Sequence, residues 1–101
     1  MIYLDSVTTI ALNGLADSSG NLINNATVSA TINDLDGNSI TTLTLTSTGS
    51  GGNYTGLITP AMTATMQDQK EYVVAVTSTL SGSVIDYRQD TQLATYRGFN
   101  E

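Results

Sequence analysis

The chain has 101 residues, the length of one ordinary domain, and charged residues make up only 12% of it, with a formal net charge of −6. Because it lacks cysteine, histidine and tryptophan (Cys 0, His 0, Trp 0), it offers no disulfide, no thiolate or imidazole metal ligand, and no Cys, Ser/His or histidine acid–base catalysis. The acidic balance repels phosphate, which argues against direct nucleic-acid binding, and nothing in the composition implies a cofactor.

Short segments of alternating apolar and polar residues, separated by Gly, Asn, Asp and Ser, predict an antiparallel all-β domain. The first strand is expected over residues 4–12, with a bulge or bend at Val7, where the apolar phase breaks. A second strand is expected over residues 26–32. Its core side carries Ala26, Val28, Ala30 and Ile32.

The middle of the chain predicts a hairpin followed by a loop. Residues 34–38, Asp-Leu-Asp-Gly-Asn, favour a tight turn, because Asp-Gly readily supplies positive φ angles. The next strand covers residues 39–46, and the out-of-phase Ile40 predicts a bulge near residues 41–42. The core side of this strand carries Leu43 and Leu45. The glycine-rich residues 48–52 predict a mobile loop.

Three further strands are predicted over residues 53–59, 71–80 and 84–95. Residues 61–69 between the first two can form one helical turn or a corner that crosses between layers. A turn at Ser81-Gly82-Ser83 joins the last two strands. The core side of these two strands is expected to carry Tyr72, Val74, Val76, Ile85 and Tyr87. The outward side of the last strand would then carry Asp86, Arg88 and Asp90.

About seven strands in a chain of this length favour a two-layer sandwich over an open sheet. We expect a single domain over residues 1–101, with the core fold over 4–95 and a C-terminal tail over 96–101.

Residues 66–76 resemble the corner and following strand of immunoglobulin-like and fibronectin type III-like domains. In that comparison Met66 takes the apolar position six residues before the corner tyrosine, Tyr72, and Asp68-Gln69 replaces the usual Pro-Gly. The resemblance implies an immunoglobulin-like antiparallel β-sandwich in which the Tyr72 hydroxyl bonds the backbone a few residues upstream.

A wider resemblance, over residues 20–97, is to small immunoglobulin-like virion proteins of tailed bacteriophages. The segments that carry it are Ala26-Thr27-Val28, Asp34-Leu35-Asp36-Gly37-Asn38, Gly52-Asn53-Tyr54-Thr55-Gly56, Tyr72-Val73-Val74-Ala75-Val76 and Ala94-Thr95-Tyr96-Arg97. It implies a non-enzymatic structural protein, first a capsid decoration or accessory protein that docks on the major capsid protein. A head–tail connector, neck or tail component is the alternative, and either would be part of a virion assembled in the host cytoplasm.

Several polar clusters favour structural roles over catalytic or metal-binding ones. Calcium prefers oxygen ligands such as those of Asp34 and Asp36, but Leu45 stands where an EF-hand needs its bidentate glutamate, and a hairpin turn explains these residues. Asp86 and Asp90 are interpreted as an exposed charge ladder with Arg88 rather than a glycosidase pair. Lys70 sits in a polar corner, unlike a desolvated Ser/Lys nucleophile. We expect no catalytic residue and no metal site.

Residues 27–32 and 40–46 carry no charge, although free strand edges are usually guarded by Lys, Pro or inward charges. Either the sheet covers these strands itself, or a neighbouring subunit does, including by self-association; a neutral threonine-rich surface is the plain alternative. Aromatic and Arg side chains are favoured interface anchors. The expected partner contacts are Tyr96, Arg97 and Phe99 in the tail, and Gly49, Gly51 and Asn53 in the loop over residues 47–53.

The sequence has no basic leader segment and no apolar run near the roughly 18 residues of a membrane span, which predicts a soluble cytoplasmic product without membrane contact. A secreted or cell-surface binding module of the adhesin type, cut from a longer precursor, is the main rival from another class.

Overall fold

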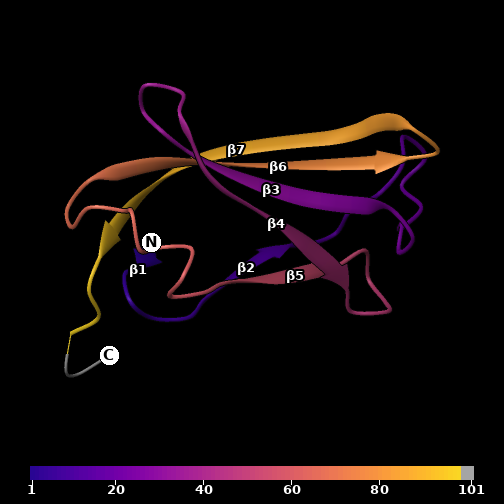
Figure 1. Ribbon diagram of the computed structural model, residues 1–101. Coiled ribbons are helices and arrows are strands. Elements are labelled where there is room, and N and C mark those ends of the chain that lie inside the picture. Colours follow the sequence, from indigo (N-terminus) through magenta and orange to yellow (C-terminus); the bar gives the residue numbers. More distant parts are fainter. Residues whose placement is uncertain (99–101) are drawn as a thin grey trace.

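The computed structural model describes residues 1–98 and contains seven strands, with no helix among the described residues (Figure 1). The strands are β1 (Ile2–Tyr3), β2 (Thr8–Leu12), β3 (Thr27–Asp34), β4 (Ser39–Ser47), β5 (Tyr54–Ile58), β6 (Glu71–Leu80) and β7 (Ser83–Thr95). They form one hydrogen-bonded sheet in the order β1-β7-β6-β3-β4-β5-β2. The all-β prediction is confirmed. The sheet is mixed rather than purely antiparallel, because β1 runs parallel to β7.

The sheet curls into a nearly closed barrel, and β4 connects the two sides because it pairs with β3 along most of its length and with β5 at its end. Up to Leu45, β4 pairs with β3, whereas its last two residues, Thr46 and Ser47, pair with β5. β5 pairs in turn with β2, so β2 and β5 lie across the interior from β6 and β7 (Figure 1). Gly56 permits the close crossing, because a Cβ there would lie 3.1 Å from Leu43 Cδ1. The barrel is thus closed along β4 and open between β2 and β7.

Two tyrosines occupy the centre of the core, and each hydroxyl ties a loop to the strand that carries the ring. Tyr54 and Tyr72 are the largest fully buried side chains. The Tyr72 hydroxyl accepts a 2.8 Å hydrogen bond from the Gln67 N–H, which confirms the predicted bond to upstream backbone. The Tyr54 hydroxyl donates to the Ile23 carbonyl (2.7 Å) and accepts from the Ala26 N–H (3.2 Å). Buried phenol groups need such partners, so both rings are fixed in place.

The central strands agree with the predicted pattern of burial. The predicted inward residues of β3, β4 and β6 are buried; they are Val28, Ala30, Ile32, Leu43, Leu45, Tyr72, Val74 and Val76. The bulge in β4 falls at Ile40 itself, because Ile32 pairs with Thr41 while Asn33 pairs with Ser39. The predicted bulge near residues 41–42 is confirmed, because the register shifts directly beside Thr41.

The first predicted strand, over residues 4–12, is shortened to β2, and β1 lies before its predicted start. β1 pairs with β7, the chain then turns through Asp5, which has a φ of 55°, and β2 pairs with β5 on the other side of the barrel. The predicted break near Val7 is therefore a crossing between layers. A second crossing follows β5, where turns with bonds such as Met66 N to Thr63 O (2.9 Å) form the corner alternative rather than a helix.

The prediction that Ile85 and Tyr87 face the core is wrong. Ile85 is 37% exposed and Tyr87 57% exposed. β7 pairs with β6 so that Val76 is opposite Arg88 and Val74 is opposite Asp90, which places the charged residues on the core side of the sheet. The phase is fixed at the other end of β7 by Ala94, which is fully buried and bonds the backbone of Lys70. Among residues 1–98, no strand covers the inner side of β7 near Arg88, so burial does not select apolar residues there.

Candidate functional site

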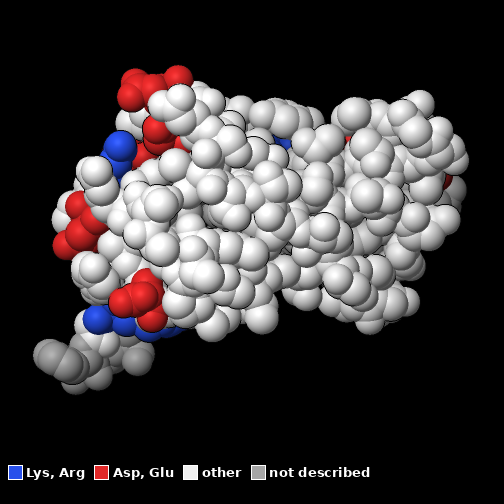
Figure 2. Space-filling view, in the orientation of Figure 1, with Lys and Arg blue, Asp and Glu red and all other residues white. Residues whose placement is uncertain are grey.

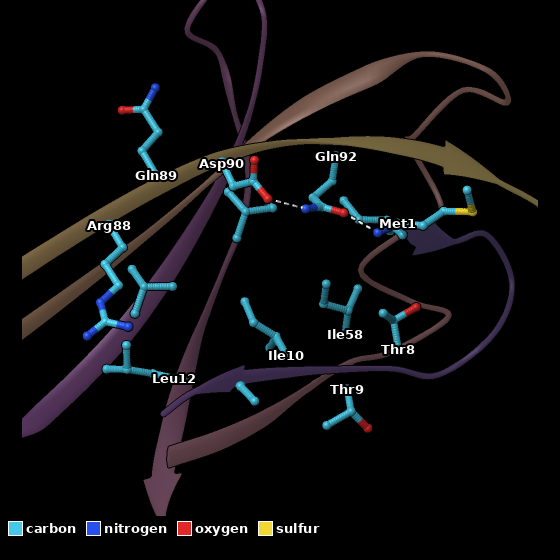
Figure 3. A pocket seen from close by; sticks show the side chains of 14 residues that line it. Met1, Thr8, Thr9, Ile10, Leu12, Ile58, Arg88, Gln89, Asp90 and Gln92 are labelled. Carbon is cyan, nitrogen blue, oxygen red and sulfur yellow. Dashed lines mark hydrogen bonds between the residues drawn. The ribbon is translucent and has the colours of Figure 1, made fainter. Parts of the chain in front are cut away.

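The open side of the barrel holds a cavity between β2 and β7, which we call the seam cavity (Figure 3). It has a volume of about 360 Å³. Its apolar lining includes Ile10 and Leu12 of β2, Ile58 of β5, and Val74 and Val76 of β6. An apolar floor with polar groups at its edge suits noncovalent binding of an apolar or extended partner.

The polar edge of the seam cavity is the charged side of β7. Arg88, Asp90 and Gln92 line it, and Figure 3 shows Arg88 and Gln92 extending from β7 toward β2. Arg88 Nε lies 2.8 Å from Asp86 Oδ2, and Gln92 Nε2 donates to Asp90 Oδ2 at 2.6 Å. The Met1 amine donates to the Gln92 side-chain oxygen. The predicted charge ladder therefore exists, but it borders a cavity instead of facing outward, which corrects the prediction.

The outer side of β4, β3, β6 and β7 carries no charge in its central rows, and we call this surface the outer face. Cross-strand neighbours form rows on it: Tyr87, Thr77, Ser29 and Thr44 in one row, and Gln89, Ala75, Thr31 and Thr42 in the next. Their side chains are exposed or half-buried. In Figure 2 acidic and basic atoms gather toward one end of the visible surface, around the β3–β4 turn and the chain ends, and the rest of that view is almost free of charge. The outer face is thus a polar surface over four strands, uncharged in its central rows.

The structure separates the two groups of predicted contact residues. Gly49, Gly51 and Asn53 lie in the β4–β5 loop, whereas the tail lies beside β1 at the other end of the molecule (Figure 1). Tyr96 is 59% exposed. The Arg97 guanidinium carbon lies 4.0 Å from the Tyr3 ring centroid, and its Nη2 donates to the Val7 carbonyl at 2.8 Å, so this cation is held by the chain's own surface. Phe99 lies outside the described residues.

The glycine-rich loop is more firmly held than its composition predicted. Gly52 is buried, its N–H donates to Asn24 Oδ1 at 2.8 Å, and its carbonyl accepts from the Leu15 N–H at 2.9 Å. Asn53 Oδ1 accepts from the Gly14 N–H at 3.0 Å. The loop therefore joins the β2–β3 connection to the body of the protein, a role that the sequence analysis missed because it depends on contacts between distant segments.

Two loops with the same pattern of hydrogen bonds precede and follow β3. In residues 17–21 and 34–38, an initial Asp accepts bonds through Oδ1 from two backbone N–H groups and through Oδ2 from the side chain of the Asn four residues later. The backbone bond of Asn21 is the first cause that lowers the pKa of Asp17, and the Asn38 side chain is the first cause that lowers the pKa of Asp34. The shared Asp-x-x-Gly-Asn spacing was the available signal for this repeated turn. These bonds explain the oxygen cluster at Asp34 and Asp36.

Lys70, the remaining polar position that the sequence singled out, lies near an aromatic ring. The Lys70 ammonium lies 5.8 Å from the Tyr72 ring centroid. Residues 1–98 contain no group of three or more acidic residues arranged to hold a metal ion. Within the same residues, no helix has the length and apolar character required to cross a membrane.

Comparisons with known proteins identify no relative. No family model matches the chain, no curated protein matches it, and no solved structure matches it.

Proposed function

We propose that the chain is a non-enzymatic structural protein of a tailed-phage virion, with an immunoglobulin-like β-sandwich that docks on coat subunits as a decoration or accessory protein. The proposed mechanism is burial of a preformed sheet surface. A subunit that binds the assembled shell and not its free components stabilises the shell by mass action.

The observation that carries this proposal is the uncharged centre of the outer face. Interface centres are depleted of charge, and the central rows of β4, β3, β6 and β7 carry none. A sheet surface whose central rows are uncharged can be buried without leaving an unpaired ion in the interface, which would be costly. The acidic groups of these four strands lie on the inner side of β7, at Asp86 and Asp90, or at strand ends, at Asp34 and Glu71, so the central rows of the outer face can contact a neighbour without burying a charge.

Two further features support the finer parts of the proposal. The Tyr72 hydroxyl bond to Gln67 has the geometry that the resemblance to immunoglobulin-like domains implied. The net charge of −6 favours the outside of a shell or its neck over a surface that faces packaged DNA, because phosphate would repel it.

The experiment is quantitative mass spectrometry of particles purified from the source of the chain, followed by rebinding of recombinant protein to particles that lack it. A copy number equal to a multiple of the capsomers supports decoration, and about a dozen copies or fewer places the protein in the neck instead. Absence from particles, with the protein found in a secreted or cell-surface fraction, would overturn the proposal in favour of a binding module.

A matched pair of variants tests the surface. Thr44→Glu places a charge on the outer face, whereas Thr55→Glu places the same charge on an exposed strand position of the other layer. We expect Thr44→Glu to abolish rebinding and Thr55→Glu to leave it intact. Equal binding by both variants would exclude the outer face as the docking surface.

A further inference from the structure

β7 has an open edge between two interruptions. On one side it pairs with β6 along its length, but on the other side β1 is opposite Ala94 and Thr95 alone. Near the start of β7, Ser78 pairs with Asp86 and Thr79 pairs with Val84, so Ile85 is an extra residue that bulges from the ladder. Among the described residues, 86–92 therefore form a regular strand with no strand paired to their outer edge, where the Met1 amine binds the Gln92 side chain.

The backbone bonds show which groups reach that edge. Ala94 donates to the Lys70 carbonyl and accepts from the Gln69 N–H, both on the β6 side, whereas the Thr95 carbonyl accepts from Leu4 on the other side. Because alternate residues of a strand bond to opposite neighbours, the residues in phase with Thr95 present their N–H and C=O groups to the open edge. These residues are Tyr87, Gln89 and Thr91. The Thr91 N–H is engaged by the Asp90 carboxylate of its own strand at 2.9 Å.

We propose that this edge pairs with the same edge of a second copy, antiparallel, about a two-fold axis at Gln89. Residues 86–92 are centred on Gln89, so the whole open stretch pairs with itself. Tyr87 and the partner's Thr91 then form hydrogen-bonded pairs, in which the Thr91 N–H leaves the Asp90 carboxylate for the partner's Tyr87 carbonyl, and Gln89 pairs with the partner's Gln89. Pairing ends at Asp86, where the bulge at Ile85 diverts the chain before it reaches β1 of the other copy.

The side chains of this register are complementary in charge. Arg88 lies directly opposite the partner's Asp90, and Asp86 opposite the partner's Gln92, and each pair occurs twice by symmetry. Arg88 and Asp90 are non-hydrogen-bonded neighbours, the type of pair in which side chains lie closest. Arg88 binds Asp86 through Nε, and its two terminal guanidinium nitrogens could bind the partner's carboxylate. An axis moved by one residue, to Arg88, would instead oppose arginine to arginine.

A second copy fits this edge better than an unrelated strand does. The charged inner side of β7 repels a strand of arbitrary sequence, which is how inward charges normally protect an edge. The symmetric register converts the same charges into attractive pairs. The other open strand at the seam cavity, β2, has only five residues and carries no charge, so it offers no comparable selection.

Cysteine cross-linking tests the register, because the chain has no cysteine of its own (Cys 0). In Gln89→Cys the two Cα atoms would be about 5.5 Å apart, within the range of a disulfide. Tyr87→Cys and Thr91→Cys are the matched controls. In this register each lies about 13 Å from the same position in the partner, whereas position 87 lies directly opposite position 91 of the partner. We expect Gln89→Cys to cross-link under mild oxidation, each control alone to remain uncrosslinked, and a mixture of the two controls to form the heterodimer.

Sedimentation of the full, unmodified chain tests the association itself. We expect a concentration-dependent species of twice 10.6 kDa, weakened at least about tenfold by Arg88→Asp and restored by the exchange Arg88→Asp with Asp90→Arg. Hydrogen exchange tests the same association in the wild-type chain, without any substitution. We expect the protection of the Gln89 amide to rise with protein concentration. A monomer up to about millimolar concentration, or a dimer that cross-links through Tyr87→Cys or Thr91→Cys alone, overturns the proposal.

Discussion

Replacement of Gly52 by alanine should reveal how firmly the β4–β5 loop is anchored. Gly52 has a φ of 65°, and an added Cβ would lie 2.4 Å from the Leu15 carbonyl oxygen and 2.8 Å from the Leu15 nitrogen. Both are backbone atoms, so no side chain can rotate away. The left-handed conformation alone costs an L-residue about 1–2 kcal/mol.

The steric conflict adds to that cost, because relief requires the two segments to separate. The Leu15–Gly52 and Gly52–Asn24 hydrogen bonds would then be lost or lengthened, at about 1 kcal/mol each. We expect Gly52→Ala to lower the free energy of unfolding by about 3–4 kcal/mol, a large part of the roughly 5–15 kcal/mol of an ordinary domain.

Gly49→Ala is the matched control. It has a φ of 97° in the same loop, but an added Cβ would meet nothing within 4 Å. It should cost only the conformational part, about 1–2 kcal/mol. Urea unfolding followed by far-UV circular dichroism measures both variants, with unchanged m-values as the check that the unfolded state is comparable. Equal destabilisation by the two substitutions would refute the contact with Leu15 as the reason for glycine at position 52.

Three further predictions concern buried groups and acid. Tyr54→Phe should lower the free energy of unfolding by about 1–3 kcal/mol, because the Ile23 carbonyl and the Ala26 N–H lose their common partner. Denaturant titration measures this loss, with Tyr87→Phe, at an exposed tyrosine, as the control. Equal effects of the two substitutions would contradict the prediction. Ser78→Ala should raise the free energy of unfolding by about 1 kcal/mol, measured as a rise in Tm, because the buried Ser78 hydroxyl has no hydrogen-bond partner among the described residues. A fall in Tm would contradict this. Asp17 and Asp34 have lowered pKa values in the folded state, so their contribution to stability is complete above the unfolded pKa of 3.8 and is lost as pH falls through the lower folded pKa. Asp34→Asn should therefore flatten the decline of Tm below about pH 4. An unchanged decline would argue against the Asn38 bonds as its cause.

The sequence predicted the central strands well, for a physical reason. β3 and β6 have neighbours on both edges and a core on one face, so alternation of Val28, Ile32, Val74 and Val76 with polar residues is required for burial. The turn at residues 34–38 was also predictable, since its bonds are local to five residues.

Features that depend on pairing between distant segments could not be predicted. The phase of β7 follows from Ala94 and its contacts with β1 and the corner before β6, whereas the apolar Ile85 and Tyr87 suggested the opposite phase. The seam cavity has the same origin, because it exists only where β2 and β7 fail to meet. The alternation of apolar and polar residues within β2 or β7 does not indicate which strand lies across the barrel from it.

The parallel contact of β1 with β7 also decides how the molecule would respond to tension. Ile2 is paired with Ala94, and Leu4 donates to the Thr95 carbonyl, so opposite ends of the chain meet side by side and point the same way. Force that draws the segment before β1 away from the segment after β7 acts along both strands and loads their hydrogen bonds together, in shear, with the Arg97–Tyr3 stack beside them. Bonds that are loaded together resist pulling better than those of a hairpin, which open one at a time, so the β1–β7 contact would be the first part of the fold to bear tension between the two ends.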